Sequence, residues 1–375
     1  MSDYWRLSSL YLMYFLVVGG MVPYWSLYLQ HLGFDPAVMG TLLAVPMLTK
    51  ILLPNIWGWL ADVTGQPRRV MQLGILGACL AFVGVCWRQD VAGLLLCLII
   101  YSTFWNAVLP QFEAITLANL GTNAHHYSRI RLWGSIGFVV AVLSLGWLFD
   151  RVSVVWLPPI LLVCLVVLVV VSLWVPKPPA RIASRSRMGL WPIVRQPRVY
   201  GFFLATAAFQ VSYGVYYGFY SLFLQQHGYS HSQIGSLWML GVLAEILLFW
   251  RLPQVLPRLN IEWCLISAMA IGALRWAGIA LWVDFLWLLV LLQLLHALTF
   301  GLFHAASVEF IRRTFGAAQQ SQGQALYVSL AYGLGGAIGV YVCGHLWASG
   351  PGWAFAFAVT LAALGALVAF NGFRK

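Results

Sequence analysis

Residues 29–40 read LQHLGFDPAVMG, and residues 224–235 read LQQHGYSHSQIG. The two stretches align at an offset of 195 residues, with Leu, Gln and both Gly residues identical. The same offset aligns Gly121 with Gly316, which lie far downstream of the two stretches. A constant offset between such separated positions predicts that the chain is a duplication and folds as two similar halves.

Each half is far more apolar than a soluble domain. Hydrophobic residues make up 62% of the 375 residues and charged residues only 8%, whereas soluble domains carry about 25% charged residues. The apolar stretches are too long and too uniform for the alternating strands of a membrane β-barrel. We therefore predict an all-α polytopic membrane protein, with twelve transmembrane helices as two homologous six-helix bundles. The predicted spans are 8–29, 37–60, 70–88, 92–119, 128–149, 154–174, 200–226, 232–256, 262–282, 285–312, 320–347 and 352–372.

The net charge of +11 reports topology and does not indicate a nucleic-acid partner. With a cytoplasmic N-terminus, the twelve spans place 16 of the 21 Lys and Arg residues on the cytoplasmic side, and only Arg88 and Arg151 outside. This asymmetry is the positive-inside signal. It predicts a multi-pass protein of the bacterial inner membrane with both termini in the cytoplasm.

A basic, proline-rich linker, VPKPPARIASRSRMGLWPIVRQPR at 175–198, separates the halves. It divides the chain into an N-terminal bundle at 1–174 and a C-terminal bundle at 199–375. The six cysteines lie singly in apolar spans, without the spacing of a metal site or a disulfide framework. We expect no cofactor and no metal.

Two charged residues occupy the middle of apolar spans at equivalent positions. Lys50 lies in LLAVPMLTKILLPNIW and Glu245 in LGVLAEILLFW, separated by the same 195 residues. A charge at the bilayer centre costs roughly 2.5–3.5 kcal/mol, so such residues usually serve a function. A twofold axis along the membrane normal predicts that both face a central cavity at equal depth. A buried structural ion pair between them is the alternative.

Further polar residues share the membrane with this pair. Arg275, Glu113 and Arg131 are charged, and a Glu113–Arg131 ion pair is again the structural alternative. His296 and His304 lie with Gln293 and Phe300 at helical spacing, and therefore on one face. Aromatic faces are predicted in the seventh span, with Gln210, Tyr213, Tyr217 and Tyr220, and in the first, with Tyr14 and Trp25. Tyr217 and Trp25 offer ring surface to a flat apolar ligand, although packing alone also explains such stripes.

The loop GWLADVTGQPRR, residues 58–69, resembles the loop signature of the major facilitator superfamily. Its matching residues are Gly58, Asp62, Gly65, Arg68 and Arg69, whereas Gln66 and Pro67 replace residues that are often basic. The resemblance implies that this loop stabilises one of two access states.

The stretches RLWGSIGFVV, GYSHSQIGSLWMLGVLAEI, RWAGIALW and LLQLLHALTFGLFHAA resemble the phenylpropionate transporter family. That family is related to the lactose-permease-like proton symporters. The resemblance implies substrate-site roles for Glu113, Arg131, Glu245, Arg275 and His296.

One position departs from the sugar symporters of that branch. Thr299 stands three residues after His296, where they carry the Glu of proton release. Glu245, Glu113, His296 or His304 must then carry a coupled proton.

These observations predict a proton-coupled transporter that takes up a small aromatic carboxylate such as 3-phenylpropionate by alternating access. Lys50 or Arg275 attracts the carboxylate, Tyr217 and Trp25 cover the ring, and Glu245 takes the proton. The expected partners are the small-molecule substrate and the lipid bilayer, with no nucleic acid and no obligate protein partner.

Other functions stay open. They are a symporter for an uncharged polar solute such as a nucleoside or oligosaccharide, an efflux transporter, or a receptor that does not transport. An enzyme is not expected, because no nucleophile–base motif, metal cluster or phosphate loop occurs.

Overall fold

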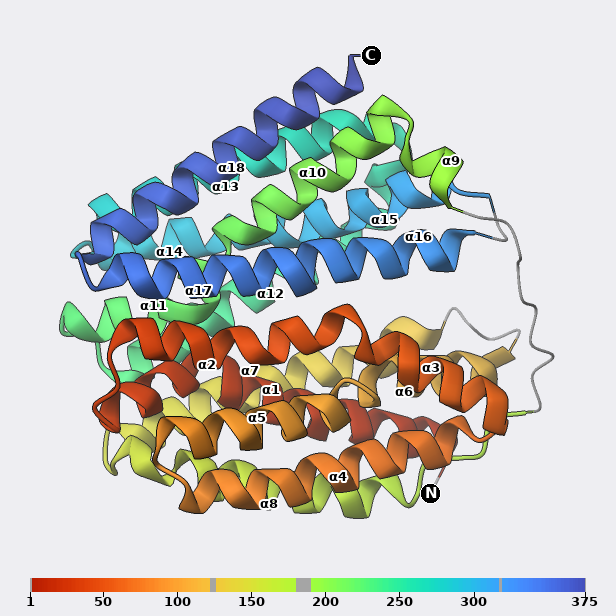
Figure 1. Ribbon diagram of the computed structural model, residues 1–375, viewed down its shortest axis with the longest axis vertical. Coiled ribbons are helices and arrows are strands. Elements are labelled where there is room, and N and C mark those ends of the chain that lie inside the picture. Colours follow the sequence, from red (N-terminus) through yellow and green to blue (C-terminus); the bar gives the residue numbers. More distant parts are fainter. Residues whose placement is uncertain (1, 122–125, 180–189, 317–318, 375) are drawn as a thin grey trace. The chain divides into compact units, whose positions relative to one another are not determined.

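The structure is a computed structural model that describes residues 2–121, 126–179, 190–316 and 319–374 (Figure 1). Nearly all of it is helical. The first half contains α1 (Asp3–His31), α2 (Pro36–Leu48), η1 (Thr49–Ile51), α3 (Leu53–Thr64), α4 (Pro67–Trp87), α5 (Val91–Trp105), α6 (Val108–Leu120), α7 (Tyr127–Phe149), η3 (Val154–Trp156) and α8 (Leu157–Ser172). The second half contains α9 (Trp191–Val194), α10 (Pro197–Ser212), α11 (Gly214–Gln226), α12 (His231–Val255), η4 (Leu256–Arg258), α13 (Ile261–Leu281), α14 (Leu286–Leu294), η5 (Ala297–Leu302), α15 (Phe303–Thr314), α16 (Gln320–Tyr327), η6 (Val328–Gly335), α17 (Gly336–Trp347) and α18 (Pro351–Phe373).

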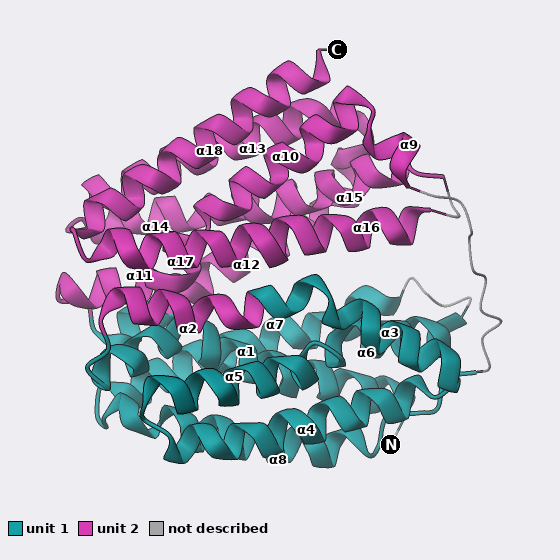
Figure 2. Cartoon of the chain, in the orientation of Figure 1, with its two compact units in different colours: residues 1–34, 48–184, 230–235 teal, residues 35–47, 185–229, 236–375 magenta. Residues whose placement is uncertain are grey.

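The chain forms two compact units (Figure 2). Unit 1 contains residues 1–34, 48–184 and 230–235, and unit 2 contains 35–47, 185–229 and 236–375. Two short segments belong to the unit of the other half: residues 35–47, which include nearly all of α2, and residues 230–235 at the start of α12. The linker at 180–189 lies outside the described residues, so the predicted bundle boundaries stay a prediction.

The described residues contain 11 helical segments that are long and apolar enough to cross a membrane. The seventh predicted span is not among them as one helix. There, residues 197–226 form α10 and α11, which meet at Tyr213 and have 16 and 13 residues. Each is shorter than a full span.

In unit 1, α1 packs along α7 and α8, while α4 packs against α5, α6 and α8. Small residues allow the closest approaches. A Cβ on Gly137 of α7 would lie 2.1 Å from the carbonyl oxygen of Leu12, and one on Gly235 would lie 2.1 Å from that of Val142. These backbones touch because lipid supplies no hydrophobic drive, so association depends on close van der Waals packing.

In unit 2, α18 packs along α10 and α13, and α11 packs against α17. A glycine also allows a close approach of α17, since a Cβ on Gly339 would lie 2.2 Å from the carbonyl oxygen of Val211. Gly40, the repeat partner of Gly235, also lies close to a backbone, that of Gly344. At these two aligned positions, a glycine therefore allows a close backbone contact in each unit.

Helix ends follow local sequence signals in both units. Gly33 and Gly228, which the repeat aligns, both have φ of +80° and terminate the preceding helices. Proline in the first turn opens α4, α8, α10 and α18, where its missing N–H costs no hydrogen bond. Ser230 and Gln233 form a capping box ahead of α12, with N–H to side-chain distances of 3.2 and 2.9 Å.

The first turn of α12 is also capped by Asp150, at the end of α7. The carboxylate accepts the backbone N–H groups of His231 at 2.7 Å and Ser232 at 3.2 Å. Partial burial opposes ionisation, but the hydrogen bonds from Ser232 and His231 outweigh it and hold the pKa of Asp150 below its ordinary value. A negative charge at a helix N-terminus is stabilising, because the free N–H groups and the helix dipole are positive there.

We expect Asp150→Ala to lower the free energy of unfolding by about 1 kcal/mol, the typical value of a helix cap. Because the folded state depresses the pKa, this contribution is present above the unfolded value of about 3.9 and is lost as the pH falls through the folded value. Thermal unfolding in detergent at pH 7 and at pH 3.5 measures the difference. Asp284→Ala, which removes an exposed carboxylate, is the control, and equal effects of both variants would contradict the capping role.

Candidate functional site

Arg275 on α13 is the centre of a buried polar cluster in unit 2, and its side chain is 0% exposed. Its Nε donates to the carbonyl oxygen of Leu292 at 2.9 Å, and Nη2 donates to Oε1 of Gln293 at 2.5 Å. Its Nη1 lies 3.2 Å from both Nδ1 of His296 and Oγ1 of Thr299. No described carboxylate lies within 4.0 Å of the guanidinium, so neutral acceptors alone solvate this cation.

The Arg275 contact determines the protonation state of His296 in this arrangement. A guanidinium has only donors, so Nδ1 of His296 must accept and the ring proton must be on Nε2. His296 is therefore neutral, and its Nε2–H lies 3.8 Å from Oε2 of Glu245. That distance is longer than a hydrogen bond, yet it places the Glu245 carboxyl next to the Nε2 edge of the imidazole.

Aromatic rings enclose the guanidinium. Its Cζ lies 4.5 Å from the ring centroid of Tyr216 and 4.8 Å from that of Trp276. Tyr216 in turn packs on Trp238 at 4.6 Å, and Tyr213 packs edge-on against Trp276 at 5.0 Å. Such faces stabilise a desolvated cation by cation–π attraction, about 2 kcal/mol in dry sites.

A half-buried layer covers this buried layer. It consists of Glu245, whose side chain is 20% exposed, with Tyr217, Phe300, His304 and Tyr332. The rings of His296, Phe300 and His304 stack in series, with centroids 5.3 and 6.3 Å apart. The predicted histidine stripe is therefore one continuous face, and Nδ1 of His304 adds a contact to the Tyr332 hydroxyl at 3.2 Å.

Two glycines and a π-helical segment allow α12 to approach the segment that carries His296 and Phe300, so that Glu245 lies against their face. A Cβ on Gly241 would lie 3.3 Å from the ring of His296, and one on Gly301 would lie 3.3 Å from Cγ of Glu245. Gly301 lies in η5, a π-helical segment directly after His296. π-helical turns widen the helix and often occur at functional sites.

In unit 1, Glu113 on α6 accepts a hydrogen bond from the Tyr127 hydroxyl at 3.3 Å. Arg131 on α7 lies instead over the Phe15 ring, with Cζ 4.0 Å from the centroid. No ion pair within 4.0 Å joins Glu113 and Arg131 in the described structure. The structural alternative is therefore not seen as a direct contact, and both residues contact aromatic side chains.

Lys50 lies in η1, the short helical break between α2 and α3, and is half-buried. In the described part of unit 1, no carboxylate lies within 4.0 Å of its ammonium. Trp25 is 2% exposed and packs against Tyr28 and Phe82. The substrate roles of Lys50 and Trp25, and a pairing of Lys50 with Glu245, stay predictions.

The predicted switch loop connects α3 and α4. Gly65 ends α3 with φ of +64°, a conformation that favours glycine. Asp62 is exposed, and Gly58 lies half-buried within α3. Arg68 and Arg69 open α4. The role of these residues in switching between access states stays a prediction.

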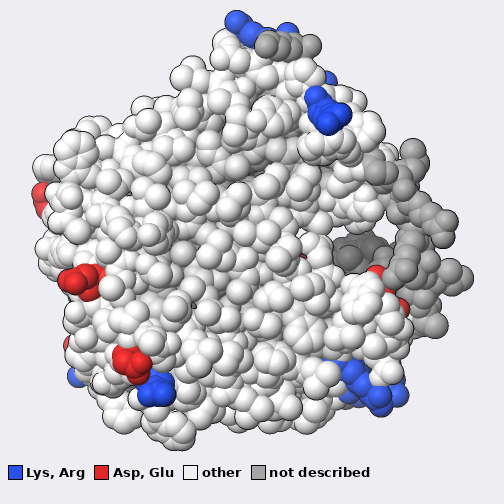
Figure 3. Space-filling view, viewed as in Figure 1, with Lys and Arg blue, Asp and Glu red and all other residues white. Residues whose placement is uncertain are grey.

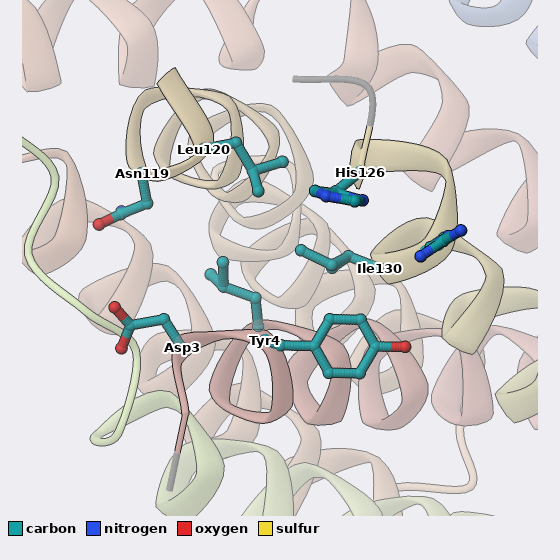
Figure 4. Close-up of a pocket in the computed structure, with 8 residues that line it drawn as sticks. Asp3, Tyr4, Asn119, Leu120, His126 and Ile130 are labelled. Carbon is teal, nitrogen blue, oxygen red and sulfur yellow. The ribbon is translucent and has the colours of Figure 1, made fainter. Parts of the chain in front are cut away.

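Unit 1 also contains an open cavity of about 260 Å³ at the ends of α1, α6 and α7 (Figure 4). Its polar lining includes Asp3, Tyr4, Asn119, His126 and Arg129. None of the predicted substrate residues lines it, so this cavity is separate from the sites above.

Sequence reasoning missed part of the buried layer in unit 2. It included Gln293 and Tyr213 only as members of stripes, and it did not single out Tyr216, Trp238 or Trp276. A polar amide and several large rings within an otherwise aliphatic membrane segment are the signal that could have identified them.

The comparisons with known proteins agree with this architecture. The chain matches the MFS_1 like family over residues 4–357. The chain belongs to this family. It is thus a multi-pass secondary transporter of the major facilitator type, and the predicted resemblance is confirmed.

Two curated relatives cover most of the chain. A probable 3-phenylpropionic acid transporter of Escherichia coli K12 is 28% identical over 88% of this chain and 87% of its own length. The maltose permease of Geobacillus stearothermophilus is 24% identical over 90% and 86% of the two chains. A crystal structure of the nucleoside transporter NupG has a TM-score of 0.86 at 19% identity, with 100% of this chain and 99% of that chain covered. That similarity confirms the all-helical major facilitator fold.

Proposed function

We propose that this protein is a proton-coupled symporter that takes up a small aromatic carboxylate, such as 3-phenylpropionate, by alternating access across the bacterial inner membrane. The observation that carries the proposal is Glu245. It is a membrane-embedded carboxyl, 20% exposed, 3.8 Å from a neutral histidine that a buried arginine holds in place. The relative named a probable 3-phenylpropionic acid transporter supports the substrate class.

The two cations have different proposed roles. Arg275 has no exposed surface and already donates to four acceptors, so we assign it to positioning His296 and Gln293. Lys50 is half-buried, with no carboxylate partner in the described part of unit 1. We therefore assign the substrate carboxylate to Lys50, and we assign the aromatic ring to Tyr217 and Phe300, which are half-buried.

In the proposed cycle, Glu245 takes a proton when the substrate carboxylate binds at Lys50. The neutral carboxyl lowers the cost of closing the site, because an uncompensated charge opposes burial. Movement of one bundle against the other then exposes the site to the cytoplasm, where proton and substrate leave. His296 stays neutral throughout, since its Nδ1 is engaged by Arg275.

A symporter for an uncharged polar solute, such as a nucleoside, is the second candidate. The buried amide of Gln210, whose Nε2 has no partner in the described structure, supports it. The structural neighbour NupG is named as a nucleoside transporter. In that case Lys50 would have a structural role only.

Uptake of labelled 3-phenylpropionate into proteoliposomes, with and without an inward proton gradient, tests the proposal. We expect accumulation only with the gradient, and we expect inhibition by other aromatic acids but not by uridine or maltose. No uptake by folded protein would remove the aromatic-acid substrate. Inhibition by uridine or maltose would favour the neutral-solute transporter.

A further inference from the structure

A second cavity, of about 530 Å³, opens where α4 begins and the chain leaves α8. Its polar lining is Gln66, Arg68, Arg69, Gln72 and Lys177, and no acidic residue lines it. Figure 3 shows a group of Lys and Arg side chains beside the junction of α3 and α4. The cavity therefore combines three positive charges with no negative charge in its described wall.

These cations lack the carboxylate partners that other cations of the chain have. Arg6 pairs with Asp3, Arg198 with Glu262, and Arg312 and Arg313 with Glu309. By contrast, Arg68 donates to the carbonyl oxygen of Leu173 at 2.6 Å, and Arg69 to the amide of Gln66 at 2.6 Å. Within the described ranges, none of the three cations has a carboxylate within 4.0 Å. The 175–198 linker contains no Asp or Glu, so it adds no compensating charge.

Arg68 and the N-terminus of α4 lie at the wall of this cavity. Nε of Arg68 is buried and has no hydrogen-bond partner in the described structure. The N-cap residue Gln66 makes no side-chain bond to the first turn of α4, and Gln66 and Pro67 both line the cavity, so the positive end of this helix lies at the cavity wall. A helix N-terminus and a guanidinium together suit a phosphate oxygen.

An apolar surface continues from the cavity along the membrane-spanning helices. Helices α4 and α8 pack against each other, and they expose large apolar side chains on their outer surfaces. On α4 these are Leu73, Leu76 and Leu80, and at the end of α8 they are Val170, Leu173 and Trp174. An exposed tryptophan near a helix end is typical of the membrane interface. This surface accommodates acyl chains, which a free inorganic anion would not need.

We propose that the cavity binds the phosphate headgroup of an anionic phospholipid, with its acyl chains along α4 and α8. The positive-inside distribution of the sequence predicts the cytoplasmic leaflet as its source. Basic pockets at this level of a membrane protein attract anionic headgroups electrostatically. The proposal goes beyond transport and does not depend on the substrate.

Native mass spectrometry of the purified full chain with added phosphatidylglycerol or phosphatidylcholine tests this site. We expect preferential retention of phosphatidylglycerol. In Arg69→Gln/Lys177→Gln its affinity should fall about thirtyfold, as expected for two basic residues near an anionic headgroup. Arg258→Gln/Arg374→Gln is the matched control, because it removes two exposed cations elsewhere, and it should retain the lipid. Arg69→Lys/Lys177→Arg keeps both charges and should also bind.

Three results would overturn the proposal. The first is equal loss of lipid in the two charge-removing variants. The second is equal retention of phosphatidylcholine and phosphatidylglycerol. The third is displacement of the lipid by millimolar glycerol 3-phosphate or inorganic phosphate, which would identify a site for a soluble anion.

Discussion

Replacement of Glu245 by glutamine is expected to abolish proton-driven accumulation while leaving substrate exchange intact. Glutamine keeps the size of the side chain and a polar oxygen beside Nε2 of His296, but it cannot exchange a proton. At one proton per substrate, a gradient of 2 pH units drives about 100-fold accumulation in the native protein. The variant should equilibrate substrate without concentrating it.

Proteoliposome assays separate the two activities. Accumulation is measured with an inward proton gradient, and exchange is measured with equal substrate on both sides and no gradient. Glu309→Gln is the control, because Glu309 pairs with Arg312 and Arg313 near a helix end. Unchanged accumulation in Glu245→Gln would exclude this residue as the proton carrier and would move the role to Glu113 or His304.

Replacement of Arg275 by methionine is expected to destabilise the protein and to eliminate transport. The side chain is the shared donor for Leu292, Gln293, His296 and Thr299. Each buried acceptor left without a donor costs about 1–3 kcal/mol, although these costs are not additive. His296 would also lose its contact with Arg275, which keeps Nδ1 as the acceptor and leaves Nε2–H beside Glu245.

Thermal unfolding in detergent and transport in proteoliposomes measure the two effects of Arg275→Met. Arg275→Lys restores the charge but not the fork of donors, so it should recover part of the stability and little of the transport. Arg251→Met, which removes an exposed arginine over Trp250, should change neither. Transport by a folded Arg275→Met protein at the native rate would contradict the positioning role.

Much of the architecture could be predicted from local signals. The repeat aligned Gly33 with Gly228, and both have the same left-handed φ. Long apolar runs predicted the spans because each must bury its backbone polar groups inside a helix. The seventh span was the exception. Hydropathy measures only the apolar character of residues 200–226 and does not predict that α10 ends at Tyr213, beside the close approach of Gly339 on α17 to Val211.

The site was predicted in part. Helical spacing placed His296, Phe300 and His304 on one face, and their stacked rings agree. The same reasoning singled out Tyr217, whereas its neighbour Tyr216 contacts Arg275. The break at Tyr213 separates α10 from α11, so helical spacing counted across it does not predict which tyrosine faces the arginine.

The amino-acid sequence alone predicts a duplicated helical membrane protein with charged residues at mid-span. These properties follow from composition, run length and a constant offset, which need no tertiary contact. Which polar groups meet depends on tertiary packing. Arg275 contacts neutral acceptors, Glu113 contacts Tyr127 and Arg131 contacts Phe15. In a membrane, both the lipid and the protein interior are apolar, so the hydrophobicity of a helix face does not indicate which helix packs against it. The partner depends instead on how small residues and aromatic rings pack.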